Sequence, residues 1–240
     1  MRLFSIAAVC AALMAPMTQA AEDTVAKLQS EQKTHKISPK DWPQWGGWSA
    51  RNNTPDGQNI ADKWDVKKGT NILWSAPLGS QTYGNAVVAN GKVYVGTNNY
   101  NGYLKRYPKT VDLGVLLCFD EKTGKFLWQH SNEKLPQGRV VDWEQLGICS
   151  SPYVEGDRLW YVTNRDEITC LDIEGFLDGE NDGPFKEEPN MNKDEADVVW
   201  KVDLMGKLGA QPHNACSCSV TALGDILLVT SSNGVDEAHK

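Results

Sequence analysis

The sequence predicts an all-β fold assembled from repeated four-stranded units. Two observations carry this prediction. A pattern of apolar strands, a turn and a closing Trp occupies residues 87–128, returns in degraded form over 151–200 and starts again at 219–230. These stretches contain no strand–helix–strand alternation and no long amphipathic helix. Because self-similarity with a period of tens of residues is typical of repeat architectures, the repeat decides the fold class.

The first unit is predicted to contain two consecutive hairpins. Residues 87–97 alternate apolar and polar side chains around Asn90-Gly91, a dipeptide that favours a two-residue hairpin turn. Residues 116–128 form two further strands around Thr123-Gly124-Lys125 and end at Trp128. Four short strands in succession are the content of one propeller blade.

Trp74, Trp128 and Trp200 divide the chain into units. Residues 72–74 are expected to be the strand that ends at the first of these tryptophans. The interval that ends at Trp200 is the longer one, and its excess lies in residues 174–197. That segment is rich in Asp, Glu, Gly, Asn and Pro, so it is predicted to be an acidic loop insertion on the surface.

The acidic loop carries a possible calcium site. Asp178, Glu180 and Asp182 alternate and are followed by Gly183, as in the first half of an oxygen-ligand calcium loop. The second half departs from that pattern, because the twelfth position is Pro189 instead of a bidentate Glu. The competing interpretation is a solvated acidic insertion between strands.

The N-terminal residues predict export. Arg2, an apolar stretch over 3–14 and Thr18-Gln19-Ala20 have the order of a signal peptide, which we place at residues 1–20. A polar lead-in follows over 21–40. No later stretch is long enough to span a membrane as a helix, so a periplasmic or extracellular location is expected. The net charge of −7 argues against a nucleic-acid partner.

Residues 41–240 resemble the PQQ-like β-propeller repeat family. The first unit is similar to its G-x-V-Y-V hairpin and T-G-x-x-x-W box, and 41–52 is similar to the segment that precedes the first blade. The resemblance implies three to four four-stranded blades of an eight-bladed ring, so the chain is expected to be an N-terminal fragment. It also implies that Trp74, Trp128 and Trp200 dock one blade against the next.

The same resemblance bears on chemistry. In the family's quinoprotein dehydrogenases, PQQ lies in the central funnel over a Trp and under a vicinal Cys-Cys disulfide. A Ca²⁺ ion held by Glu, Asn and Asp lies beside it, and an Asp acts as base. This sequence has no adjacent Cys pair, since Cys216-Ser217-Cys218 is one residue out of pattern, and it has no Cys-x-x-Cys-His haem motif.

Two functions are therefore weighed. The first is an exported binding or assembly module without redox activity, which receives a protein partner or a small-molecule ligand on a propeller face. The alternative is a periplasmic PQQ- and Ca-dependent quinoprotein dehydrogenase that oxidises an alcohol or a sugar. Because the same fold serves both functions, the repeat alone does not decide between them.

The residues that depart from the repeat are the candidates for a site. They lie in one segment, and those that could contact a ligand or cofactor are His213, Asn214, Cys216 and Cys218. Cys149 is a possible disulfide partner for either cysteine of that segment. Cys118 and Cys170 occupy equivalent repeat positions and are expected to be buried in core strands. Trp42, Trp45 and Trp48 are expected to seal the start of the ring, with a carbohydrate-stacking platform as the alternative.

Overall fold

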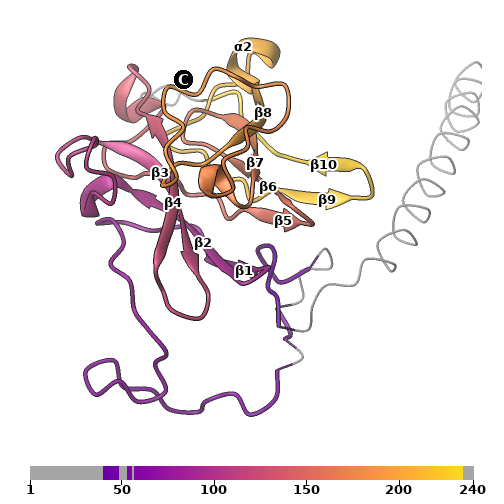
Figure 1. Cartoon of the computed structure of the whole chain (residues 1–240). Coiled ribbons are helices and arrows are strands. Elements are labelled where there is room, and N and C mark those ends of the chain that lie inside the picture. Colours follow the sequence, from indigo (N-terminus) through magenta and orange to yellow (C-terminus); the bar gives the residue numbers. More distant parts are fainter. Residues whose placement is uncertain (1–39, 49–52, 56, 235–240) are drawn as a thin grey trace, which may run out of the picture.

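The computed structural model describes residues 40–48, 53–55 and 57–234 (Figure 1). The predicted signal peptide and all but the last residue of the predicted lead-in lie outside this part of the chain. The described residues form three antiparallel sheets, which we call blades 1 to 3 in chain order. The predicted all-β class and repeated sheets are confirmed.

Blades 1 and 2 each contain four strands, and each strand pairs with the next one in the chain. The strands of blade 1 are β1 (Val87–Ala89), β2 (Lys92–Asn98), β3 (Leu113–Asp120) and β4 (Phe126–Glu133). The strands of blade 2 are β5 (Tyr153–Glu155), β6 (Arg158–Val162), β7 (Glu167–Asp172) and β8 (Val198–Asp203). In the described residues blade 3 contains β9 (Thr221–Leu223) and β10 (Ile226–Leu228). Short helical turns join them: η1 (Asn99–Asn101), η2 (Gly138–Val140), η3 (Gly175–Leu177) and α2 (Leu204–Leu208).

The hairpin of β1 and β2 shows how the sequence specifies these sheets. Asn90 and Gly91 have φ angles of 54° and 74°, so both adopt the left-handed conformation of a type I′ turn. Val87 then pairs with Tyr94 and Ala89 with Lys92. The predicted hairpin is confirmed.

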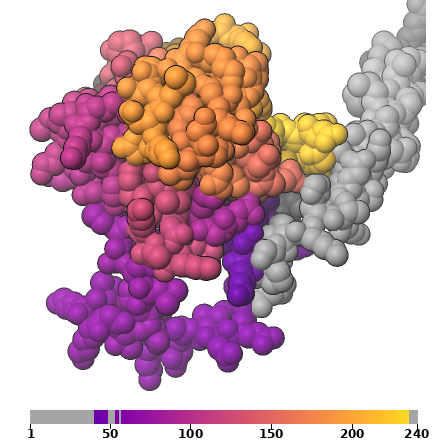
Figure 2. Space-filling view, viewed as in Figure 1, coloured from indigo at the N-terminus to yellow at the C-terminus, as the bar shows by residue number. Residues whose placement is uncertain are grey.

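One predicted strand is wrong. Residues 72–74 have no strand conformation, and Leu73 is 93% exposed. Among the described residues, no neighbouring strand offers its edge to this segment, so its backbone lacks the pairing that a sheet requires. The segment precedes β1, and its Trp74 packs against the core of blade 1, whereas part of the chain before β1 forms a purple arm that projects away from the blades (Figure 2).

The main core lies between blades 1 and 2. Because side chains alternate along a strand, β3 buries Leu116 and Cys118 on one face and Val115 and Leu117 on the other. The first face packs against residues of blade 2 such as Tyr161. Cys118 and Cys170 are both buried, as predicted for their shared repeat position.

Two of the repeat tryptophans make equivalent hydrogen bonds. The indole N–H of Trp74 donates to the backbone carbonyl of Glu121 at 2.7 Å. The indole N–H of Trp128 donates to the carbonyl of Ile173 at 3.1 Å. In both blades the acceptor is the residue directly after the Asp that ends the third strand. Trp200 is partly buried.

The opening segment crosses the first strands of all three blades. Trp42 pairs with Val88 of β1 through N–H···O bonds of 2.6 and 3.0 Å. The carbonyl of Pro43 accepts from the N–H of Val154 in β5 at 2.8 Å. The side-chain oxygen of Gln44 accepts from the hydroxyl of Thr221 in β9 at 2.8 Å. Residues 42–44 therefore tie together β1, β5 and β9, which lie side by side (Figure 1).

Candidate functional site

Loops from the three blades meet at one end of the sheets. In an antiparallel sheet of four consecutive strands, the start of the first strand, the connection between the second and third strands and the end of the fourth strand lie at the same end of the strands. The residues at this end are 79–86, 99–112, 134–152 and 209–220, and we call them the loop face. The N–H of Asn85 donates to the hydroxyl of Ser151 at 2.8 Å, and the N–H of Ser151 donates to the hydroxyl of Ser219 at 3.1 Å. These bonds join equivalent positions of successive blades, so the three loop sets lie next to one another.

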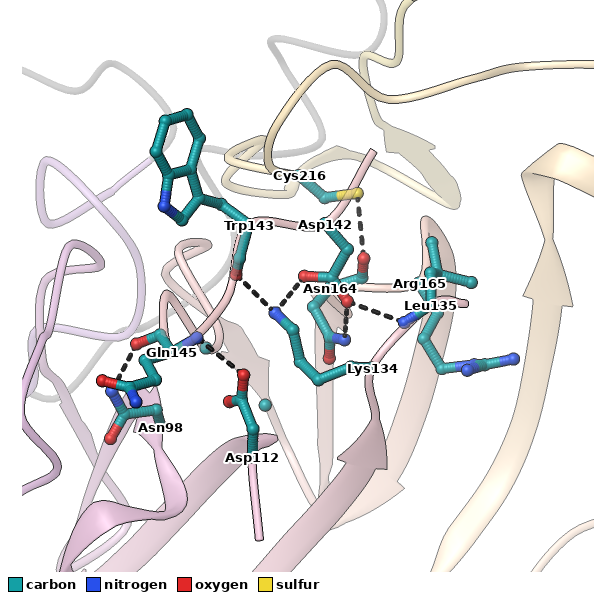
Figure 3. A network of polar contacts seen from close by, with 12 residues as sticks. Asn98, Asp112, Lys134, Leu135, Asp142, Trp143, Gln145, Asn164, Arg165 and Cys216 are labelled. Carbon is teal, nitrogen blue, oxygen red and sulfur yellow. Dashed lines mark hydrogen bonds and ion pairs between the residues drawn. The ribbon is translucent and has the colours of Figure 1, made fainter. Parts of the chain in front are cut away.

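A buried carboxylate fixes the central loop of this face. Asp142 is 2% exposed and forms an ion pair with Lys134. Its other oxygen accepts from the backbone N–H of Leu135 at 3.0 Å and from the side chain of Asn164 at 2.8 Å. Figure 3 shows this network beneath the loop. Because both oxygens are bonded, the cost of burying the charge is offset, and the network rigidifies residues 134–142.

The same loop is bonded to blades 1 and 3. The N–H of Gln145 donates to Asp112 at 2.7 Å, and its carbonyl accepts from the side chain of Asn98. Trp143 donates its backbone N–H to the carbonyl of Asn214 at 2.7 Å, while its own carbonyl accepts from Lys134 at 2.8 Å. The backbone of Trp143 is thus held from both sides, whereas its indole points away from the polar network (Figure 3).

Three exposed aromatic side chains belong to the loop face. Trp143 is 42% exposed, Tyr83 63% and Tyr100 57%. Each comes from a different connection, and the backbones of Trp143 and Tyr100 are fixed by hydrogen bonds. Rigidly held aromatic rings with exposed faces are the side chains that most often anchor protein partners.

The candidate segment of residues 211–218 belongs to the loop face. Asn214 adopts a left-handed conformation with φ of 64°, donates its backbone N–H to the carbonyl of Val140 at 2.8 Å and donates its side chain to the carbonyl of Arg139 at 2.6 Å. Asn214 therefore connects the loop before β9 to η2 through two hydrogen bonds. His213 lies beside it and is partly buried.

Cys216 and Cys218 line one small cavity. Its volume is about 180 Å³, and Asp166 is also in its wall, whereas His213 is not. The thiol of Cys216 contacts the carbonyl of Asn164 at 3.6 Å, and the thiol of Cys218 accepts from the N–H of Thr230 at 3.1 Å. Burial and the nearby Asp166 carboxylate raise the pKa of Cys216, so this thiol stays protonated. Cys149 is also a free thiol, as are the other four cysteines of the described residues.

The acidic loop does not gather its three carboxylates into a cluster. Asp182 forms an ion pair with Arg158 at 2.8 Å, and the carboxylate of Asp178 accepts from the backbone N–H of Glu180 at 2.9 Å. Within the described ranges, no group of three or more His, Cys, Asp or Glu side chains is placed to hold a metal ion. These residues cap a loop and pair with an arginine.

The described residues do not fit the PQQ site that the family resemblance implies. The two cysteines closest to the required pattern are separated by Ser217, and each thiol makes its own local contact. The calcium beside the cofactor requires carboxylate ligands, and the described part of the chain has no group of three or more His, Cys, Asp or Glu side chains placed to hold a metal ion. We therefore derive no step through PQQ.

A second cavity involves residues for which the sequence offered no signal. It has a volume of about 250 Å³ and lies between β4 of blade 1, β7 and β8 of blade 2, and the acidic loop. His130 is in its wall. The sequence shows this histidine only as a polar residue two positions after Trp128, and the proximity to blade 2 that defines the cavity is not visible in it.

Comparisons with known proteins agree with the architecture. No family model matches the chain, and no curated protein matches it. Among solved structures, the chain is similar to a europium-containing methanol dehydrogenase, with a TM-score of 0.50, 15% identity and 85% of this chain covered. A second similar structure is the quinohemoprotein alcohol dehydrogenase from Comamonas testosteroni, with a TM-score of 0.39, 15% identity and 86% of this chain covered.

These similarities concern the fold. The predicted PQQ-like β-propeller fold is confirmed for the described residues. The chain spans 29% of the methanol dehydrogenase chain and 25% of the quinohemoprotein chain. In the part of the sequence that the structure describes, no helix has the length and apolar character needed to cross a membrane.

Proposed function

We propose that this chain is part of an exported PQQ-like propeller that acts as a binding module without redox activity, and that its loop face receives a protein partner. The observation that supports the proposal most is the set of exposed aromatic rings, Tyr83, Tyr100 and Trp143, on a loop face whose central loop is held by the buried hydrogen bonds of Asp142. A loop held in this way lowers the entropy that is lost when a partner binds. Loops on a rigid scaffold commonly carry the function of a propeller.

We also propose that Trp74, Trp128 and Trp200 dock successive blades. The equivalent indole bonds of Trp74 and Trp128 to the carbonyls of Glu121 and Ile173 support this role. Docked blades keep the three loop sets in one fixed arrangement, which a multi-loop binding face requires.

A photo-crosslinking experiment tests the loop face. A photoreactive amino acid in place of Tyr83 should give discrete adducts with a protein of the exported fraction. The matched control replaces Trp64, which is 69% exposed but lies on the arm before β1. With the partner identified, Trp143→Ala should weaken its binding about tenfold or more, as at an interface hot spot, and Trp64→Ala should change it less than about twofold. Equal adduct formation at both probe positions would contradict the proposal.

The redox alternative has its own test. The protein is incubated with PQQ and Ca²⁺, and dye-linked oxidation of alcohols and sugars is measured. We expect no turnover above that of the cofactor alone. Turnover that depends on both PQQ and Ca²⁺ would replace the proposal with the quinoprotein dehydrogenase function.

A further inference from the structure

The cavity between blades 1 and 2 has walls from several segments that are distant in the sequence. β4 contributes His130 and Asn132, the connection before β3 contributes Arg106, β7 and β8 contribute Glu167 and Lys201, and the acidic loop covers it. In Figure 2 the orange surface of that loop packs against the blades. Its volume of about 250 Å³ is below the roughly 300–1,000 Å³ of pockets for drug-sized ligands, so it suits a single small molecule.

A hydrogen-bond chain across the blade interface fixes the proton on His130. The side-chain N–H of Asn132 donates to the hydroxyl oxygen of Tyr161 at 3.0 Å. The only other partner of that hydroxyl in the described residues is Nδ1 of His130 at 2.5 Å. The tyrosine hydrogen therefore goes to Nδ1, and the neutral imidazole carries its own hydrogen on Nε2.

The imidazole stays neutral at physiological pH. Burial, followed by the positive charge of Lys201, lowers the pKa of His130 to about 3. Nε2 is then a hydrogen-bond donor, whereas the contact with the Tyr161 hydroxyl is made by Nδ1. Because His130 lines the cavity, a ligand oxygen there would satisfy this donor.

The charges of the cavity select against an anion. Its walls hold three cationic side chains and five carboxylates. Each cation already has a carboxylate partner: Arg106 pairs with Glu195, Lys201 with Glu167 at 3.4 Å, and Arg165 with Glu167 at 3.9 Å. A ligand carboxylate or phosphate would have to displace one of these partners, whereas a neutral hydroxyl group can accept from His130 and donate to a glutamate without displacing either.

Two aromatic rings complete the walls. Tyr107 has the guanidinium of Arg106 4.5 Å from its ring centroid, and Phe185 has the ammonium of Lys201 5.2 Å from its own. Each ring therefore attracts a cation that also belongs to an ion pair, which holds the polar and apolar parts of the wall in place together. The cavity combines apolar ring surface with donors and acceptors spaced around it.

We propose that this cavity binds a small, neutral, polyhydroxylated molecule of about the size of one sugar ring, with a hydroxyl oxygen accepting from Nε2–H of His130. The site shares Arg106 and Tyr107 with the loop face, but Tyr83, Tyr100 and Trp143 are not in its wall, and it requires no redox cofactor. Arg106 and Lys201 remain paired when the ligand is bound. The site is built by the interface of two blades, so it exists only when both blades are folded together.

Histidine-selective NMR tests the proposal on the unaltered protein. The protein is labelled with ¹⁵N-histidine, and the sequence contains only four histidines, so the signals can be resolved. A neutral panel of glucose, galactose, mannose, inositol and glycerol is titrated in. At least one compound should shift the Nε2 signal of His130 in a saturable manner and leave His213 unchanged. No shift with any neutral compound would overturn the proposal.

Charged analogues and variants sharpen the test. Glucuronate and glucosamine should bind at least tenfold more weakly than the best neutral sugar, and tenfold tighter binding of either one would overturn the assignment of ligand class. His130→Phe keeps an aromatic ring without the N–H and should weaken binding at least tenfold. His213→Gln is the control and should change the affinity less than twofold. Should His130→Phe fail to fold, the titration of the unaltered protein still decides. Trp143→Ala should leave sugar binding unchanged, so the two sites fail or succeed independently.

Discussion

The fourth strands of blades 1 and 2, β4 and β8, share a Trp–Cys pair with the neighbouring strand and differ two residues further along. In β4 Trp128 lies opposite Cys118, and in β8 Trp200 lies opposite Cys170. Two residues further along, β4 has His130 opposite Leu116, whereas β8 has Val202 opposite Ile168. The Trp position is thus kept from one blade to the next, while the following position on the same face changes from polar to apolar.

This difference separates the part of the interface that packs as core from the part that we propose to bind a ligand. The kept tryptophan belongs to the main core between the blades. The polar position opens a cavity, because His130 pairs with the Tyr161 hydroxyl of the neighbouring blade instead of filling the space with methyl groups. A repeat protein can acquire a specific site in this way without altering its architecture.

Removing the indole of Trp128 should have the largest effect. Trp128 is fully buried, so Trp128→Ala is expected to lower the free energy of unfolding by about 3–5 kcal/mol. Trp74 makes the equivalent bond but is only partly buried, and Trp74→Ala should cost roughly half as much. Urea titrations of the two variants measure both values. Equal losses would show that burial does not distinguish the two interfaces.

Replacing His130 by Val, the residue type found at the equivalent position of blade 2, should have an intermediate effect. His130→Val removes the acceptor for the Tyr161 hydroxyl, which is fully buried, and should destabilise the protein by about 1–3 kcal/mol. In a Tyr161→Phe background the same change should cost distinctly less, because no hydroxyl remains to be satisfied. The double-mutant cycle isolates the bond. A coupling energy near zero would contradict the assigned hydrogen-bond chain.

The fold was predictable wherever neighbouring residues determine it. Asn90-Gly91 specifies its hairpin because only a few residue types adopt positive φ angles at both turn positions. The acidic loop was recognisable from composition, and β8 does begin at Val198, directly after the predicted insertion. The repeat phrase located the tryptophans, whose indole bonds follow the same rule in both blades.

The sites were much less predictable, because they depend on contacts between distant segments. Nothing near Trp42 in the sequence indicates that it pairs with Val88. His130 and Tyr161 are separated by 31 positions and meet only because one blade packs on the next. The strand expected at 72–74 failed for the same reason, since local apolar character cannot supply the partner that a strand needs. Asp182 was a calcium candidate in the sequence because its partner Arg158 is 24 positions away in the chain.

The smallest predicted effect concerns the Asp that ends the third strand of each blade. The side chain and N–H of Thr123 donate to Asp120 at 2.6 and 2.8 Å, and these bonds lower its pKa below the ordinary 3.8. Burial raises the pKa of Asp172 above that value, with the bond from the N–H of Glu174 and the charge of Arg158 acting in the opposite direction. Asp120 therefore stabilises the fold above its ordinary pKa, and this contribution is lost as the pH falls through the lowered value. For Asp172 the sign is reversed, and its contribution is lost as the pH rises through the raised value.

An NMR titration of the carboxyl carbons checks this contrast. The midpoints of Asp120 and Asp172 should fall on opposite sides of 3.8. Asp182→Asn serves as the control, because the charge of Asp182 is one of those that raise the pKa of Asp172. The variant should move the Asp172 midpoint downward and leave Asp120 in place. Midpoints on the same side of 3.8 would contradict the difference between the two blades at this repeat position.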